Sequence, residues 1–143
     1  MSFSQTLDQV VTLATAIRDF WHAELPKRHA RYPFVSPDED SGPPPREAAE
    51  LDQLLHSLPA EEIYKLLLIT QMGIGAVSSH DLYQGYERLR DRYPTPTQAA
   101  MIISGNAALA DYLTDGIEEL KSAGIDIDSL DFSMTASSPG TVI

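Results

Sequence analysis

The side chains that could support acid–base or metal chemistry are spread thinly along this sequence. The four histidines are His22, His29, His56 and His80. No two of them stand four residues apart on one helix, and none belongs to an HExxH pattern. Spacing alone leaves open a zinc site assembled in space from histidines and carboxylates. The sequence predicts no metal site and identifies no catalytic residue.

Acidic residues form two short groups that resemble calcium loops only weakly. Residues 38–42 and 126–131 alternate aspartate with other residues, but neither group has glycine at the sixth position and glutamate at the twelfth. The pair Glu61-Glu62 follows Pro59 and fits the positive end of a helix better than a catalytic dyad. We therefore predict no bound cofactor.

Gly73 and Gly75 are the strongest turn signal in the chain. They lack the third glycine of a dinucleotide-binding fingerprint and the lysine of a phosphate loop, so we interpret them as the end of a helix. If Gly73 is the left-handed residue, Ile74 and Ile69 supply the apolar contact that accompanies such an ending. The sequence predicts that Gly73 is the left-handed residue.

The stretch 57–77 is the centre of the predicted fold. Leu66, Leu67, Leu68 and Ile69 are consecutive, and four such residues point to every side of a helix. Pro59 fits the first helical turn. This pattern predicts a buried central helix with other helices around it.

Further helices are predicted by apolar periodicity and by terminal signals. The first covers about 4–25 and ends at Pro26, and a second covers 46–56. Another covers 81–93, a short one follows the capping box of Thr95 and Gln98, and the last covers 107–123 and ends at Gly124. The expected fold is an all-α, single-domain orthogonal or irregular bundle of five to six helices.

Two segments lack a helical period. Residues 26–46 form a proline-rich loop inside the helical domain, which covers 1–124. Residues 125–143 form an extended C-terminal tail. Its predicted anchors are Ile127, Leu130 and Phe132.

The chain of 143 residues carries a formal net charge of −11, and only Lys121 is basic after Arg92. This charge disfavours binding to nucleic acid or to anionic membranes and favours a basic protein partner. The sequence has no cysteine, no long apolar run and no basic-then-apolar N-terminus. A bacterial protein of the cytoplasm is the simplest interpretation.

The order of segments resembles a family of small bacterial domains of unknown function. The matching residues are Leu58, Pro59, Glu61, Gly73, Gly75, Leu109, Ala110, Asp111, Tyr112, Leu113 and Gly116, within about 5–124. The family usually has tryptophan and arginine near the glycine turn, where this chain has Gln71 and Ile74. The resemblance implies an all-helical fold and implies no activity.

Two classes of function follow from these observations. We expect a non-enzymatic protein–protein interaction or regulatory module that forms a homodimer, since eleven aromatic residues and several apolar stripes must be covered by a small bundle. The alternative is a small-molecule-binding protein or an enzyme. Its pocket would be lined by Trp21, His22, Tyr83, Tyr86 and Tyr112.

Overall fold

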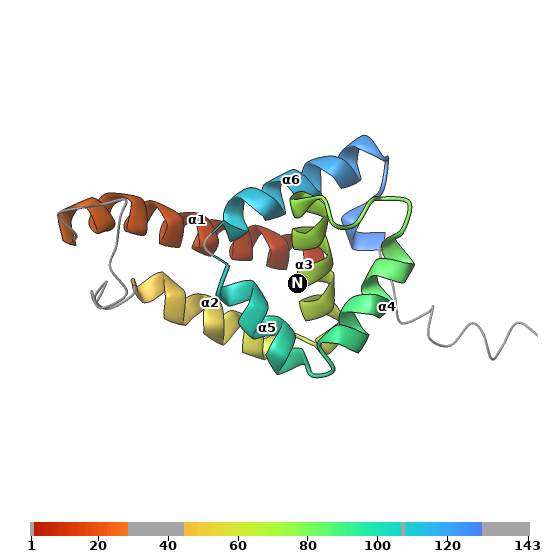
Figure 1. The fold of residues 1–143 in the computed structure, drawn as a ribbon, viewed down its shortest axis with the longest axis horizontal. Helices are drawn as coiled ribbons and strands as arrows, with labels where there is room; N and C mark the ends of the chain where they lie inside the picture. The colour runs from red at the N-terminus through yellow and green to blue at the C-terminus, as the bar shows by residue number, and fades with distance from the viewer. Residues whose placement is uncertain (1, 29–44, 107, 130–143) are drawn as a thin grey trace, which may run out of the picture.

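The computed structural model describes residues 2–28, 45–106 and 108–129, with side chains described except at 25–28 and 129. The described residues form six α-helices and a short 3-10 helix and no strand, which confirms the all-α prediction. The elements are α1 (Phe3–Arg28), α2 (Arg46–Ser57), α3 (Ala60–Ile74), α4 (Leu82–Arg92), α5 (Pro96–Ser104), α6 (Leu109–Ser122) and η1 (Ile127–Ser129). Figure 1 shows α3 at the centre, with α4, α5 and α6 around it and with α1 and α2 extending to one side.

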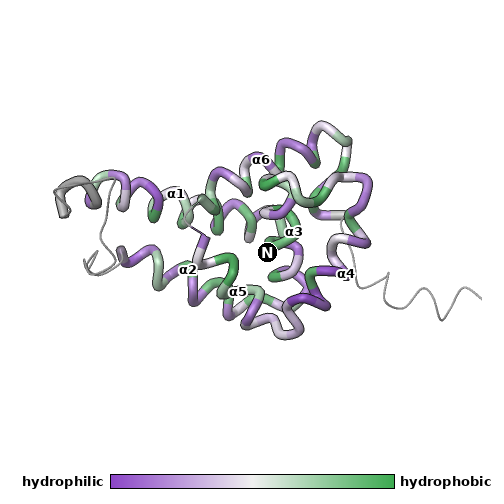
Figure 2. Tube along the Cα trace, viewed as in Figure 1, coloured by the Kyte–Doolittle hydropathy of each residue, from purple (hydrophilic) through white to green (hydrophobic). Residues whose placement is uncertain are grey.

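The central helix is buried, as predicted. Every residue from Ile63 to Thr70 is buried, because α3 packs against α4, α5 and α6 at once. Even Lys65 is inside; its Nζ lies 3.8 Å from Oε1 of Glu61 and 5.1 Å from the centre of the Phe3 ring. Figure 2 shows hydrophobic segments toward the middle of the bundle and hydrophilic stretches along α4. The apolar run of α3 therefore forms the core on which the other helices pack.

Two glycines bring α3 and α6 into backbone contact. A β-carbon on Gly73 would lie 1.9 Å from the carbonyl oxygen of Tyr112, and one on Gly116 would lie 2.2 Å from the carbonyl oxygen of Ile69. The pairs run in opposite directions along the two helices, so α3 and α6 cross antiparallel. No side chain larger than hydrogen fits at either glycine without a shift of backbone.

The prediction that Gly73 is left-handed is wrong. The helix continues to Ile74, and Gly75 adopts φ +94°. The N–H of Ala76 donates to the carbonyl of Gln71 at 2.9 Å and that of Gly75 to the carbonyl of Met72 at 3.1 Å, which is the Schellman pattern. Gly73 is needed inside the helix for the close approach to α6, so the turn falls two residues later.

Helix α1 is longer than predicted, because it continues past Pro26 to Arg28. Proline cannot donate an N–H bond, but its φ near −65° is a helical value, so one proline in a last turn does not have to end a helix. The predicted loop 26–46 therefore begins inside α1, and α2 begins at Arg46. Residues 29–44 of that loop lie outside the described part of the chain.

The terminal signals of the later helices are confirmed in part. Thr95 and Gln98 form the predicted capping box, with Pro96 at the first helical position. Gly124 adopts φ +74° after α6, as expected of a closing glycine. Helix α6 begins at Leu109 and not at 107. The side chain of Asn106 accepts a 2.9 Å bond from the N–H of Ala108.

The first residues of the predicted tail pack on the bundle. Ile125 and Ile127 lie against the core. Asp128 accepts hydrogen bonds from the backbone N–H of Ser4 at 2.9 Å and from its hydroxyl at 3.0 Å, at the start of α1. The described residues 125–129 thus belong to the bundle, and the anchors predicted at Leu130 and Phe132 lie outside the described residues.

Candidate functional site

A groove between α1 and α2 is a largely apolar hollow on the surface of the described bundle. The two helices lie side by side and run in opposite directions (Figure 1). Between them lies a cavity of about 460 Å³. It is lined by Asp8, Gln9, Thr12 and Leu13 of α1 and by Glu50 and Leu54 of α2. Hereafter these six residues are called the α1–α2 groove.

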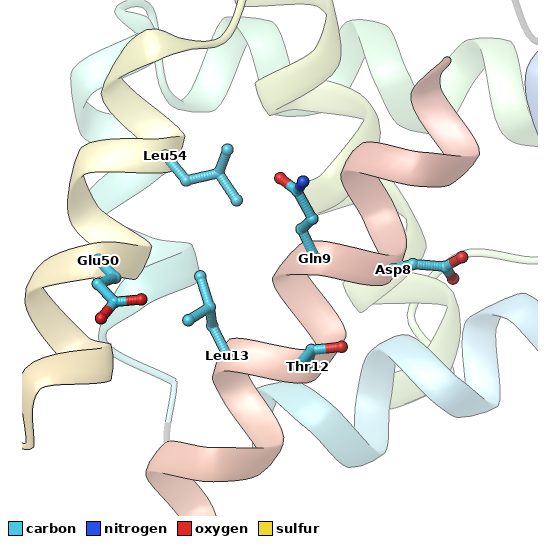
Figure 3. A pocket seen from close by; sticks show the side chains of 6 residues that line it. All are labelled: Asp8, Gln9, Thr12, Leu13, Glu50 and Leu54. Carbon is cyan, nitrogen blue, oxygen red and sulfur yellow. The ribbon is translucent and has the colours of Figure 1, made fainter. Parts of the chain in front are cut away.

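The floor of the groove follows from how each helix meets the core. Leu7, Val10 and Ala14 turn one side of α1 inward and are buried. Leu13 lies at the edge of the core-facing side of α1, and Leu54 lies at the corresponding edge of α2. Both leucines are therefore only partly buried. Figure 3 shows the side chains of Leu13 and Leu54 pointing into the space between the helices. The groove therefore has an aliphatic floor that the bundle itself does not cover completely.

The rim of the groove is acidic. Asp8 and Glu50 are exposed and lie on opposite helices. In Figure 3 Asp8 projects outward from α1, whereas Glu50 points toward the groove. Oε1 of Glu50 accepts from Nε of Arg46 at 3.0 Å, but the Arg46 side chain is 85% exposed. Exposed pairs four residues apart contribute about 0.3–0.5 kcal/mol, so Glu50 can exchange this partner at little cost.

A second cavity, of about 510 Å³, lies beside α4 and is lined by polar and charged side chains. Its lining residues are Glu87, Arg90, Asp91 and Pro94. The guanidinium of Arg90 lies 5.7 Å from the centre of the Tyr64 ring and 6.0 Å from that of Tyr86. Both signs of charge meet here, so the lining gives a ligand no preferred charge. We interpret this region as the polar edge of the α3–α4 contact.

The two tyrosines under Arg90 are structural. Burial raises the pKa of Tyr86 to about 12, although the nearby Arg90 charge acts in the opposite direction. Burial likewise raises the pKa of Tyr64, whose hydroxyl donates a 2.5 Å hydrogen bond to the backbone carbonyl of Tyr93. Both hydroxyls stay protonated near neutral pH. The two tyrosines hold α3 against α4, and the Tyr64 hydroxyl bonds α3 to Tyr93, which directly follows α4.

The five residues predicted to line a small-molecule pocket are not brought to one place. Tyr86 is in the core, whereas Tyr83 on the same helix is 54% exposed. Trp21 is half-buried and contacts Phe20 edge to face, with ring centres 5.0 Å apart. His22 is exposed and Tyr112 is half-buried on α6. The end of α1 that carries Trp21 and His22 projects away from α4 (Figure 1), so these two helices do not face one cavity.

Within the described ranges no group of three or more histidine or acidic side chains is placed to hold a metal ion. No helix of this part of the chain is both long enough and apolar enough to cross a bilayer.

Most of the groove was missed by sequence reasoning. Leu54 belongs to the apolar face of α2, but Leu13 lies off the main apolar stripe of α1. A leucine just outside an apolar stripe is a usable signal of a second contact surface. The acidic rim residues resemble any other solvated charge in the sequence, because only the pairing of α1 with α2 brings them together.

Comparisons of the chain with models of protein families, with curated proteins and with solved structures found no match.

Proposed function

We propose that this protein is a non-enzymatic interaction module that binds a basic, amphipathic helix of a partner protein in the α1–α2 groove. The observation that carries the proposal is an aliphatic floor, Leu13 and Leu54, between helices whose rims bear Asp8 and Glu50. A helix that lies in such a groove presents apolar side chains at three- and four-residue steps. Lysine or arginine residues beside those anchors then meet the acidic rim.

The charge of the chain supports a basic partner over an acidic one. At a net charge of −11 the protein attracts cationic segments from a distance and repels acidic ones. The rim can orient a bound cationic segment, because Asp8 and Glu50 lie on opposite sides of the floor. Apolar contact supplies affinity, and the two carboxylates favour one orientation of the ligand.

Several expectations from the sequence belong to this proposal. They are membership of the small bacterial family, a place in the cytoplasm, and a homodimer. The resemblance and the composition support the first two. The dimer is supported by exposed apolar residues on α5, which are separate from the groove.

A short synthetic helix of leucine, alanine and lysine, labelled with a fluorophore, tests the groove by anisotropy. Leu54→Ser should raise its Kd at least about tenfold, because the floor loses a desolvated anchor. Asp8→Lys and Glu50→Lys should each raise it several-fold and reduce its dependence on salt. A peptide with glutamate in place of lysine should not bind.

Asp19→Lys and Asp52→Lys are the matched controls, since both replace exposed acidic residues outside the groove lining with the same change of charge. If these controls weaken binding as much as Asp8→Lys, the attraction comes from overall charge and the groove proposal fails. Thermal melts followed by circular dichroism check that each variant remains folded. A Kd unchanged in Leu54→Ser contradicts the proposal as well.

A further inference from the structure

The outer side of α5 exposes large apolar side chains. Met101 is 65% exposed and Ile102 is 42% exposed. Thr97 precedes Met101 by one helical turn and is exposed too. Hereafter Thr97, Met101 and Ile102 are called the α5 face. Consecutive residues of an α-helix lie about 100° apart around its axis, so Met101 and Ile102 together leave a broad side of α5 apolar and exposed.

This face is also free of charge in a strongly acidic chain. No charged residue occurs from Tyr93 to Ala110, a stretch that contains all of α5. Two copies of a chain with net charge −11 repel each other at most orientations. A contact made through α5 itself places no like charges side by side, because this helix carries no charged residue.

A small cavity opens beside the same helix. It has a volume of about 120 Å³, several times the ~30 Å³ that a water occupies in the liquid. Its walls include Leu58, Ile63 and Ala100, with Thr97 and the exposed His56 also lining it. Met101 lies one helical turn after Thr97, which lines the cavity, and is largely exposed, so it stands beside this cavity and does not fill it.

We propose that the α5 face is a homodimer interface in which Met101 of each copy enters the cavity beside α5 of the other. A two-fold axis makes such a contact reciprocal, because each copy carries both the projecting side chain and the cavity. Methionine suits this role, since its unbranched, flexible side chain adapts to irregular hollows. Ile102 packs around the insertion. The interface goes beyond the proposed binding of a basic helix and does not depend on it, because the α5 face and the α1–α2 groove share no residue.

Sedimentation equilibrium over a range of micromolar concentrations tests the interface with the full chain. The wild type should approach twice the 15.7 kDa of one chain. Met101→Glu should raise the dimer Kd at least about tenfold, because it places two carboxylates at the contact. Ile74→Glu is the matched control: Ile74 is 46% exposed at the end of α3, and its replacement should leave the dimer intact.

Salt dependence separates this interface from one held by ion pairs. Raising NaCl from about 50 mM to about 500 mM screens the repulsion between two acidic chains, so the dimer should be equally strong or stronger. Binding of the basic peptide to the groove should weaken over the same range. A wild type that remains monomeric at high micromolar concentration overturns the proposal. The proposal also fails if the Met101→Glu variant still forms the dimer, or if Ile74→Glu weakens the dimer as much as Met101→Glu does. It fails too if the higher salt concentration dissociates the wild-type dimer.

Discussion

The carbonyl oxygen of Tyr112 lies 1.9 Å from the point where Gly73 would carry a β-carbon. One turn away on each helix, Gly116 stands in the same relation to the carbonyl of Ile69, at 2.2 Å. The central helix and α6 therefore touch backbone to backbone at two places. This contact explains why both helices carry glycine inside their apolar faces, although an interior glycine lowers helix propensity.

Gly73→Ala and Gly116→Ala should each destabilise the protein by about 1–3 kcal/mol, because the added methyl forces the helices apart. The measurement is the urea midpoint with an unchanged slope. Gly105→Ala is the control, since Gly105 has φ −82° and its β-carbon would lie 3.1 Å from the Met101 carbonyl. It should cost less than about 1 kcal/mol. Equal effects at all three positions would contradict the close approach of α3 and α6.

Gly75 should respond to substitution for a different reason. At φ +94° it has nothing within 4 Å of a β-carbon, so only backbone strain opposes a side chain there. Gly75→Ala should cost about 1 kcal/mol, and Gly75→Asn less, because asparagine tolerates the left-handed region. At Gly73 asparagine should be worse than alanine, because its larger side chain meets the α6 backbone. If asparagine and alanine rank alike at both sites, the two glycines do not have separate roles.

Stability should fall at alkaline pH through the buried tyrosines. The pKa of Tyr86 is raised from 10.0 to about 12, and that of Tyr64 is also raised. A raised folded-state pKa means that its contribution is complete below pH 10 and is lost as the pH rises toward 12. Tyrosinate absorbance should show a late-ionising class that disappears on unfolding. Tyr86→Phe should reduce that class and the loss of stability between these pH values. An unchanged titration in this variant would contradict the assignment.

The bonds from Ser4 to Asp128 should stabilise both ends of the described bundle together. Asp128→Ala removes a carboxylate that accepts from the N–H and the hydroxyl of Ser4, at the positive end of α1. We expect a loss of about 0.5–2 kcal/mol, as for other helix caps. Ser4→Ala removes one of the two bonds, and the double variant should lose less than the sum of the single changes. Strict additivity would show that the bond from the Ser4 hydroxyl contributes nothing.

Much of the fold was predictable because the signals are local. Four consecutive apolar residues from Leu66 to Ile69 predict burial on all sides wherever the neighbours come from. Thr95 and Gln98 are three residues apart and form their capping box within one turn. The ends of α2 and α4 fall within about two residues of expectation for the same reason. The predicted end of the first helix at Pro26 is wrong, because a proline in a last turn is a weak signal that a helix ends there.

The sequence by itself determined that this chain forms helices, where most of them begin, and which of them is central. Only the tertiary structure decided what Gly73 is for, since two glycines can equally end a helix until another helix approaches one of them. The same holds for the groove. Leu13 and Leu54 are far apart in the chain, and an acidic residue such as Glu50 acquires its position at a rim only when α1 and α2 pair. Helical periods and caps act over a few residues, whereas close approach and surface shape depend on contacts between distant segments.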